Sequence, residues 1–184
     1  MPVLVVVALM WVSEVIDQVT PGSLDWYGIR PREVDGLGGI VLSPFLHGGY
    51  EHLLANTSGL LVLGALLAWT TRHLWVVTAG VVLLGGLGVW LTGAPNTVHI
   101  GASGVVYGYA AFLAVYGFVA RKLWSAFAGI LVIVVYGSLL WGVLPLQDGV
   151  SWQGHLFGAL AGGGIALWLG RRARRRRLSA ASFV

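Results

Sequence analysis

Long apolar runs separated by short polar connections occupy most of this chain. Each run is close to the ~20 residues that a helix needs to cross roughly 30 Å of hydrocarbon. The pattern predicts six membrane-spanning helices, over residues 2–19, 51–71, 73–92, 102–120, 124–143 and 152–170. Residues 20–50 are rich in Gly and Pro and predict a long loop after the first helix. We therefore expect an all-α polytopic membrane protein with one membrane domain, residues 1–170.

The first apolar run has a second interpretation as a cleaved signal peptide. No basic segment precedes it, and no A-x-A-like cleavage site follows it. A retained helix is therefore the preferred prediction for residues 2–19.

The overall composition agrees with a membrane protein. Of the 184 residues, 57% are hydrophobic and 10% are charged, whereas soluble domains carry about 25% charged residues. Cysteine is absent, which excludes disulfides, thiolate metal ligands and a cysteine nucleophile.

The net charge of +4 comes mainly from the end of the chain. Six of the eleven basic residues are arginines in a tail, residues 171–184, that directly follows the last apolar run. Such a tail is expected to contact anionic lipid headgroups rather than nucleic acid. Membrane lipid is therefore an expected partner, and no nucleic acid is expected.

The distribution of Lys and Arg predicts the orientation in the membrane. In a six-helix arrangement Arg72, Arg121, Lys122 and the six tail arginines fall on one side, and only Arg30 and Arg32 fall on the other. The positive-inside rule places the first side in the cytoplasm. Both termini are then cytoplasmic and the long loop is extracytoplasmic. A bacterial plasma membrane is the expected location.

Four polar side chains in the apolar runs are candidates for chemistry, because ionisable and polar groups are rare and functional at such positions. Ser103, His155, His52 and Asn56 all fall near the outer ends of their predicted helices. A serine can attack a carbonyl when a histidine accepts its proton, as in acyl transfer. Asn56, His52 and the Ser103 amide would then donate hydrogen bonds to the oxyanion.

Other features of these helices bear on the same hypothesis. No Asp or Glu lies near His155 in the sequence, so a Ser–His dyad is preferred to a triad. Tyr107, one turn after Ser103, is placed to pack against the imidazole. The alternative for Ser103 is a helix cap whose small neighbours pack against another helix.

Glycines are spaced so that two of the helices can approach closely. Gly104 and Gly108 form one G-x-x-x-G, and Gly158 and Gly162 form another after His155. Such spacing permits close backbone contact in lipid, although generic helix packing also uses it.

The motifs together resemble the rhomboid family of intramembrane serine proteases. They are H-x-x-x-N at His52 and Asn56, G-x-S-G at residues 101–104, and His155 before G-x-x-x-G. The resemblance covers all six predicted helices and implies a six-helix rhomboid-like bundle. It implies Ser103 as nucleophile, His155 as base, and Asn56, His52 and the Ser103 amide as oxyanion hole.

The resemblance also implies supporting residues and a reaction. Tyr107 would stack on His155, with Gly101 and Gly104 as supporting residues. The family cleaves transmembrane segments of other proteins near the outer face of the membrane, without a cofactor. Single-span membrane proteins are then the expected substrates. Many rhomboids carry a Trp-Arg pair in the long loop, where this sequence has Gly38 and Gly39.

Alternatives of other classes are weaker. The spacing H-x-x-x-E-H from His47 to His52 is one residue too long for a zinc motif, so no metal is expected. Val105 replaces the glycine that an α/β-hydrolase elbow requires. A catalytically silent rhomboid-like protein that binds transmembrane helices is the main alternative, and the oligomeric state is left open.

Overall fold

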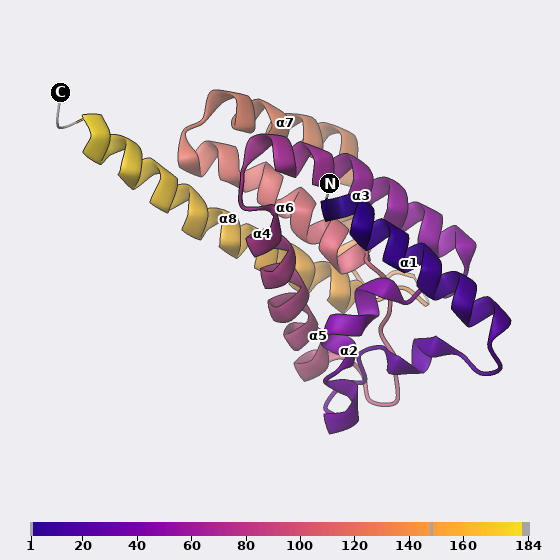
Figure 1. Cartoon of the computed structure of the whole chain (residues 1–184). Coiled ribbons are helices and arrows are strands. Elements are labelled where there is room, and N and C mark those ends of the chain that lie inside the picture. Colours follow the sequence, from indigo (N-terminus) through magenta and orange to yellow (C-terminus); the bar gives the residue numbers. More distant parts are fainter. Residues whose placement is uncertain (1, 148, 182–184) are drawn as a thin grey trace.

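The computed structural model describes residues 2–147 and 149–181. These residues form helices and connecting segments, and the β-pairing among them is a single bridge between Ile29 and His99. Five long helices are continuous, and Figure 1 shows how they are arranged. They are α1 (Pro2–Val19), α3 (Tyr50–Thr70), α6 (Ser103–Ala120), α7 (Leu123–Tyr136) and α8 (Trp152–Ala181). A further helical rod consists of α4 (Leu74–Gly80), a π-helical turn η4 (Val81–Gly85) and α5 (Gly86–Thr92), and the 3-10 segment η5 (Gly137–Val143) continues α7.

Four of these rods are long and apolar enough to cross a membrane. They are Tyr50–Thr70, Leu74–Thr92, Ser103–Ala120 and Leu123–Val143. The chain is therefore an all-helical integral membrane protein, as its apolar runs predict. The terminal helices α1 and α8 are not among these four described helices. That the chain crosses the membrane six times therefore remains a prediction.

Helix α6 is the central helix of the bundle (Figure 1). Over the most apolar 18 residues of each span, 56% of the residues of α6 are buried, compared with 17% in the span that begins with α7. The buried side chains of α6 include Phe112, Leu113 and Tyr116. Helix α7 is therefore peripheral, and α6 carries its first residue, Ser103, into the middle of the bundle.

Helices α6 and α8 approach each other through glycines. A Cβ atom added to Gly158 would overlap the carbonyl oxygen of Gly104, and one added to Gly162 would overlap that of Gly108. The two pairs follow in the same order along both helices, which therefore run parallel. Backbone contact this close is possible because neither helix places a side chain between the two.

The segment 20–50 is folded, although its composition predicts a loop. It contains η1 (Leu24–Tyr27), η2 (Val34–Gly36), α2 (Gly39–Leu42) and η3 (Ser43–Phe45). Glycine positions in it are tight: a Cβ on Gly39 would overlap the backbone of Gly28. Helix α2 is thus packed on the backbone that follows η1, and glycine permits the contact rather than breaking the structure.

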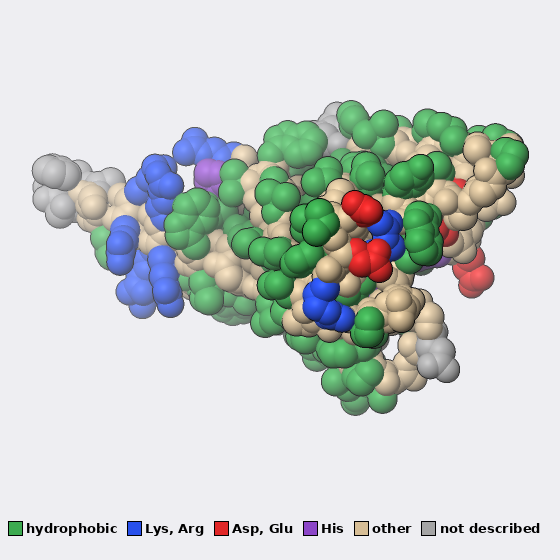
Figure 2. Space-filling model, turned by 90° about the horizontal axis from the view of Figure 1, so that it is seen from below, with side chains coloured by type: hydrophobic (Ala, Val, Ile, Leu, Met, Phe, Trp, Pro, Cys, Tyr) green, Lys and Arg blue, Asp and Glu red, His purple; other side chains and the backbone are tan. Residues whose placement is uncertain are grey.

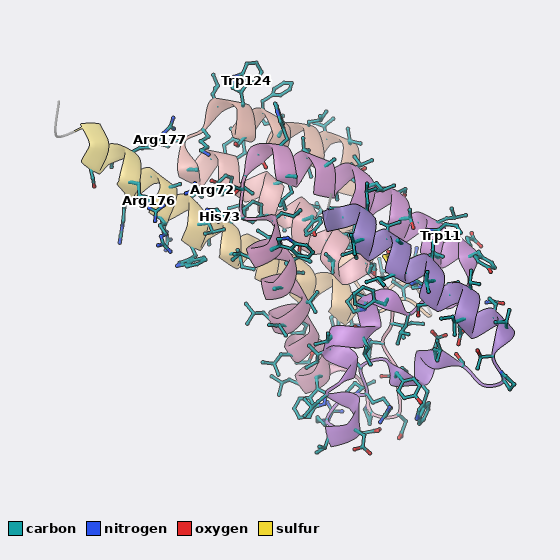
Figure 3. The ribbon with its side chains drawn as sticks, in the orientation of Figure 1. Trp11, Arg72, His73, Trp124, Arg176 and Arg177 are labelled. Atoms are coloured by element: carbon teal, nitrogen blue, oxygen red, sulfur yellow. The ribbon has the colours of Figure 1, made fainter. Side chains whose placement is uncertain are left out.

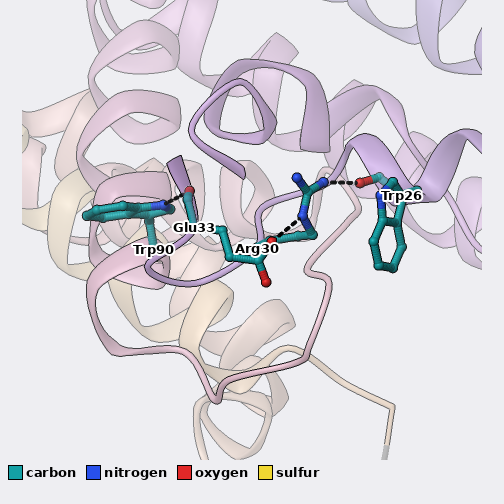
Figure 4. A network of polar contacts seen from close by, with 4 residues as sticks. All are labelled: Trp26, Arg30, Glu33 and Trp90. Carbon is teal, nitrogen blue, oxygen red and sulfur yellow. Dashed lines mark hydrogen bonds and ion pairs between the residues drawn. The ribbon is translucent and has the colours of Figure 1, made fainter. Parts of the chain in front are cut away.

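Polar contacts attach this segment to the end of α5 (Figure 4). Arg30 pairs with Glu33 at 2.7 Å and donates to the Trp26 carbonyl oxygen at 2.8 Å. The Arg30 guanidinium also lies 5.1 Å from the Trp26 ring centroid, and Trp90 donates to the Glu33 carbonyl oxygen at 2.8 Å. An arginine–tryptophan contact is thus present in the loop, earlier in the sequence than Gly38.

Helix α8 does not end near residue 170, where the apolar run ends. It continues to Ala181 and projects beyond the other helices (Figure 1). Arginine and leucine are good helix formers, and no Gly or Pro follows Gly170 in the chain, so nothing in the sequence stops the helix there. The predicted tail 171–184 is helical as far as it is described, and residues 182–184 lie outside the described part.

Candidate active site

Ser103 and His155 lie in hydrogen-bonding contact. Ser103 is the first residue of α6, and His155 lies in the first turn of α8. The Ser103 Oγ is 2.9 Å from the His155 Nε2. His155 is buried and Ser103 is half-buried. The parallel, glycine-mediated packing of α6 on α8 brings together two side chains that are 52 positions apart in the sequence.

The imidazole of His155 is held from two further directions. Its Nδ1 is 2.8 Å from the carbonyl oxygen of Gly142, and its ring stacks on Tyr107 with centroids 4.0 Å apart and planes 5° from parallel. A carbonyl oxygen can only accept, so Nδ1 carries the proton and Nε2 is free to accept from the Ser103 hydroxyl. The Gly142 carbonyl thus holds the tautomer that an aspartate holds in a Ser-His-Asp triad.

Gly142 is a site residue that the sequence analysis did not identify. A Cβ at this position would overlap the Tyr107 hydroxyl and lie 3.2 Å from the His155 Nδ1. Only glycine therefore lets η5 approach the two stacked rings. The glycine itself, between bulky residues, was the one available signal in the sequence.

Asn56 and His52 flank the approach to Ser103 from helix α3. A Cβ on Gly101 would lie 2.6 Å from two ring atoms of His52 and 3.3 Å from the Asn56 Nδ2. Gly101 has a φ of +101°, which favours glycine. Both α3 side chains therefore contact the backbone two residues before the serine.

The amide of Asn56 is a buried donor without a partner. The side chain is 4% exposed, and its Nδ2 makes no hydrogen bond with any described residue. An unpaired buried donor costs about 1–3 kcal/mol, so such a group is uncommon unless it serves a ligand or an intermediate. It lies beside the first turn of α6, whose N–H groups lack partners within the helix and whose dipole favours negative charge.

A small cavity adjoins the serine. It has a volume of about 50 Å³ and is lined by Ser103, His99 and Ser151, among others. This volume exceeds the ~10–15 Å³ that one water molecule requires, and its lining is partly polar. The cavity is therefore large enough to hold water beside the serine.

His99 connects three parts of the chain around this cavity. Its Nδ1 is 2.6 Å from the Ser151 Oγ and its Nε2 is 3.0 Å from the Thr97 Oγ1, while its backbone pairs with Ile29. Burial lowers the pKa of His99 below its ordinary value. The ring thus links the first loop, the segment before α6 and the start of α8, which is a structural role.

His47 and His52 lie next to each other near the start of α3. The two rings contact edge to face with centroids 5.0 Å apart. Burial, with the His52 ring beside it, lowers the pKa of His47 to about 4. Among the described residues no group of three or more His, Cys, Asp or Glu is arranged to hold a metal ion.

The fold and this arrangement define a helical membrane protein with a serine and a histidine in hydrogen-bonding contact. The sequence profile of the rhomboid domain matches residues 35–172. Uncharacterized proteins of Mycobacterium tuberculosis and Mycobacterium bovis are each 46% identical over 186 residues, covering 95% of this chain and 77% of theirs. An uncharacterized protein of Mycobacterium leprae is 44% identical, covering 95% of this chain and 73% of its own. The chain therefore belongs to the rhomboid family, which is generally a family of intramembrane serine proteases.

Proposed function

We propose that this protein is an intramembrane serine endopeptidase that cleaves transmembrane segments of other membrane proteins. The observation that carries the proposal is the 2.9 Å contact between the Ser103 Oγ and the Nε2 of an imidazole whose Nδ1 is held by a carbonyl oxygen. This arrangement suits general-base activation of a serine and needs no metal or cofactor.

In the first half of the reaction His155 accepts the Ser103 proton while the Ser103 Oγ attacks the scissile carbonyl carbon. The carbonyl oxygen becomes an oxyanion, which the Ser103 backbone N–H, Asn56 and His52 stabilise. The imidazolium then donates its proton to the leaving amine as the C–N bond breaks. The product is an ester between Ser103 and the new carboxyl end of the substrate.

In the second half water hydrolyses this ester. His155 accepts a proton from the water, the water oxygen attacks the ester carbonyl carbon, and the proton passes to the departing Ser103 Oγ. The 50 Å³ cavity beside Ser103 offers a place for that water. Such a cavity matters because the surrounding helices are apolar.

A transmembrane helix is the substrate that fits the surroundings. An apolar cavity of about 150 Å³ between α6, α7 and η5 is lined by residues that include Tyr107, Tyr136 and Val143. The outer side chains of this region are apolar and exposed; Leu140 is 72% exposed. A single-span protein can approach through the lipid on this side, because α7 is peripheral and the cavity beside it reaches Tyr107.

Charge and the relatives both support the proposed cellular location. The mycobacterial relatives favour a bacterial plasma membrane, and the positive-inside rule places both termini in the cytoplasm. Ser103 and His155 lie at the opposite end of α8 from its arginines, so the site would open to the extracytoplasmic side. Residues 144–151 would cover it, of which residue 148 lies outside the described part.

A helix-binding protein without catalytic activity is the other candidate function, and labelling of the serine separates the two. A fluorophosphonate or isocoumarin probe is expected to label the wild-type protein and not the Ser103→Ala variant, measured by in-gel fluorescence in detergent. Ser58→Ala, which removes an exposed serine hydroxyl bonded to its own helix, is a matched control and should label like the wild type. Equal labelling of wild type and Ser103→Ala, or none of either, would contradict the protease assignment.

Asn56→Ala is expected to lower kcat by on the order of 10²–10³, as loss of one oxyanion donor does in a serine protease. The loss is partial because other donors remain. Cleavage rates on a single-span substrate measure it, with circular dichroism as the folding control. A loss as complete as that of Ser103→Ala would assign Asn56 a different role.

A further inference from the structure

A hollow at the opposite end of the molecule from Ser103 gathers positive charge. It has a volume of about 770 Å³ and lies where α3, α4, α6 and α8 meet. Its lining contains one histidine and four cationic side chains, and we call this cavity the basic hollow. They are His73, Arg72, Lys122, Arg172 and Arg176.

Three separate segments of the chain contribute these cations. Arg172 and Arg176 are four residues apart on α8 and share one face of it. Figure 3 shows Arg176 on the part of α8 that projects beyond the bundle, with Arg72 and His73 next to this helix. Figure 2 shows a large group of Lys and Arg side chains at this end of the molecule, apart from the other Lys and Arg side chains in that view. The continuation of α8 beyond residue 170 therefore completes the basic hollow.

Aromatic side chains line and orient the charges. The Lys122 Nζ lies 5.7 Å from the Tyr116 ring centroid, and the Arg172 guanidinium lies 6.0 Å from that of Trp168. Cation–aromatic contacts of this kind hold a cation without neutralising it. The charges thus remain available to an anion.

No carboxylate of the described residues balances these cations. The sequence contains no Asp or Glu between Glu51 and Asp148 or after Asp148, so none of the contributing segments supplies one. The one ion pair among the described residues joins Arg30 and Glu33, which are far along the chain from the residues of the basic hollow. Burial lowers the pKa of His73, and the four cations lower it further. Like charges at short range repel, and a bound anion would relieve that repulsion.

The depth of the hollow indicates the source of the anion. Four exposed tryptophans surround this end of the bundle, at the end of α3, the start of α4, the start of α7 and on α8 before its arginines. They are Trp69, Trp75, Trp124 and Trp168. Exposed tryptophans gather at the level of the lipid headgroups, where phosphate groups lie.

We propose that the basic hollow binds a phosphate group, supplied by the headgroup of an anionic phospholipid. Arginine suits this ligand because its planar guanidinium donates two parallel hydrogen bonds to phosphate oxygens. The site is distinct from Ser103 and His155 and does not depend on the proposed protease activity. It would fix the depth and tilt of α8, the helix that carries His155 at its other end.

Lipid binding is tested on the purified full chain carrying Ser103→Ala, which separates the result from catalysis. Native mass spectrometry in neutral detergent would follow retention of phosphatidylglycerol and of phosphatidylcholine. We expect selective retention of phosphatidylglycerol, weakened about 25-fold by Arg172→Gln with Arg176→Gln, roughly fivefold for each cation removed. The matched control is Arg171→Gln with Arg174→Gln, which removes the same charge from α8 outside the hollow and should change affinity less than about threefold.

Equal weakening by both double variants would mean a diffuse attraction and would overturn the site. The ring signals of His73, assigned by their loss in His73→Gln, give a second measurement. Phosphatidylglycerol is expected to raise the pKa of His73, since a neighbouring negative charge favours the imidazolium form. Inorganic phosphate at equal phosphate concentration should leave it unchanged. An equal rise with inorganic phosphate would overturn the lipid source, and no rise with either would overturn the site.

Discussion

Replacing His155 by alanine is expected to abolish cleavage while the protein stays folded. Removal of the histidine from a serine protease lowers kcat by on the order of 10⁶, because the serine hydroxyl loses the base that accepts its proton. The 2.9 Å Ser103–His155 contact and the Gly142 carbonyl bond would both be lost. Cleavage of a single-span substrate in proteoliposomes measures the effect, and thermal unfolding in detergent measures the fold.

Ser58→Ala is the control for this variant. It removes an exposed hydroxyl on α3 that bonds to its own helix, outside both proposed sites, and should retain cleavage within a few-fold. Persistent cleavage by His155→Ala would remove the proposed base. Loss of cleavage together with loss of the thermal transition would indicate a structural effect, and Gln at position 155 would then be the variant to compare.

Replacing Gly162 by alanine is expected to cause the second large loss. The added Cβ would overlap the carbonyl oxygen of Gly108 and lie 2.8 Å from its Cα, so α6 and α8 must separate. Overpacking of this kind costs about 1–3 kcal/mol of stability. Because Ser103 and His155 lie one on each helix, a displacement near 1 Å is expected to lower activity about 100-fold as well.

The neighbouring glycine supplies the control. A Cβ on Gly163 meets nothing within 4 Å, so Gly163→Ala makes the same chemical change on the same helix without the overlap. It should match the wild type in cleavage rate and unfold at an equal or higher temperature, since alanine favours helix over glycine. Equal losses in both variants would show that helix propensity, and not the contact with α6, governs this region.

The two predictions test different aspects of the site. His155→Ala removes one of the two proposed reacting groups and leaves the helix contact, whereas Gly162→Ala leaves both of these groups and alters their separation. A protein that cleaves only when both are intact depends on the chemistry and on the close approach of α6 to α8. That dependence is the physical basis of the proposed function.

The first loop and the last helix show where sequence patterns are weak predictors. Gly39 lies in a segment whose composition is typical of a loop. It nevertheless permits close packing of α2 on the preceding segment. The arginines after Gly170 mark the end of an apolar run, but arginine favours helix as well as water, so α8 continues to Ala181. Apolar content thus predicts which segments lie in lipid. It predicts neither the folding of the loop between them nor the residue at which a helix ends.

The sequence alone was sufficient for the helical membrane class and for membership of the rhomboid family, which the domain match confirms. Run lengths and motif spacings are local properties of the chain, so they can be inferred without a structure. Three features depended on the tertiary structure: the distance between Ser103 and His155, the carbonyl of Gly142 on the imidazole, and the convergence of four cations beside α8. The first two join residues of separate helical elements whose approach depends on how closely glycine lets the backbones pack, and the third joins residues from three separate segments of the chain.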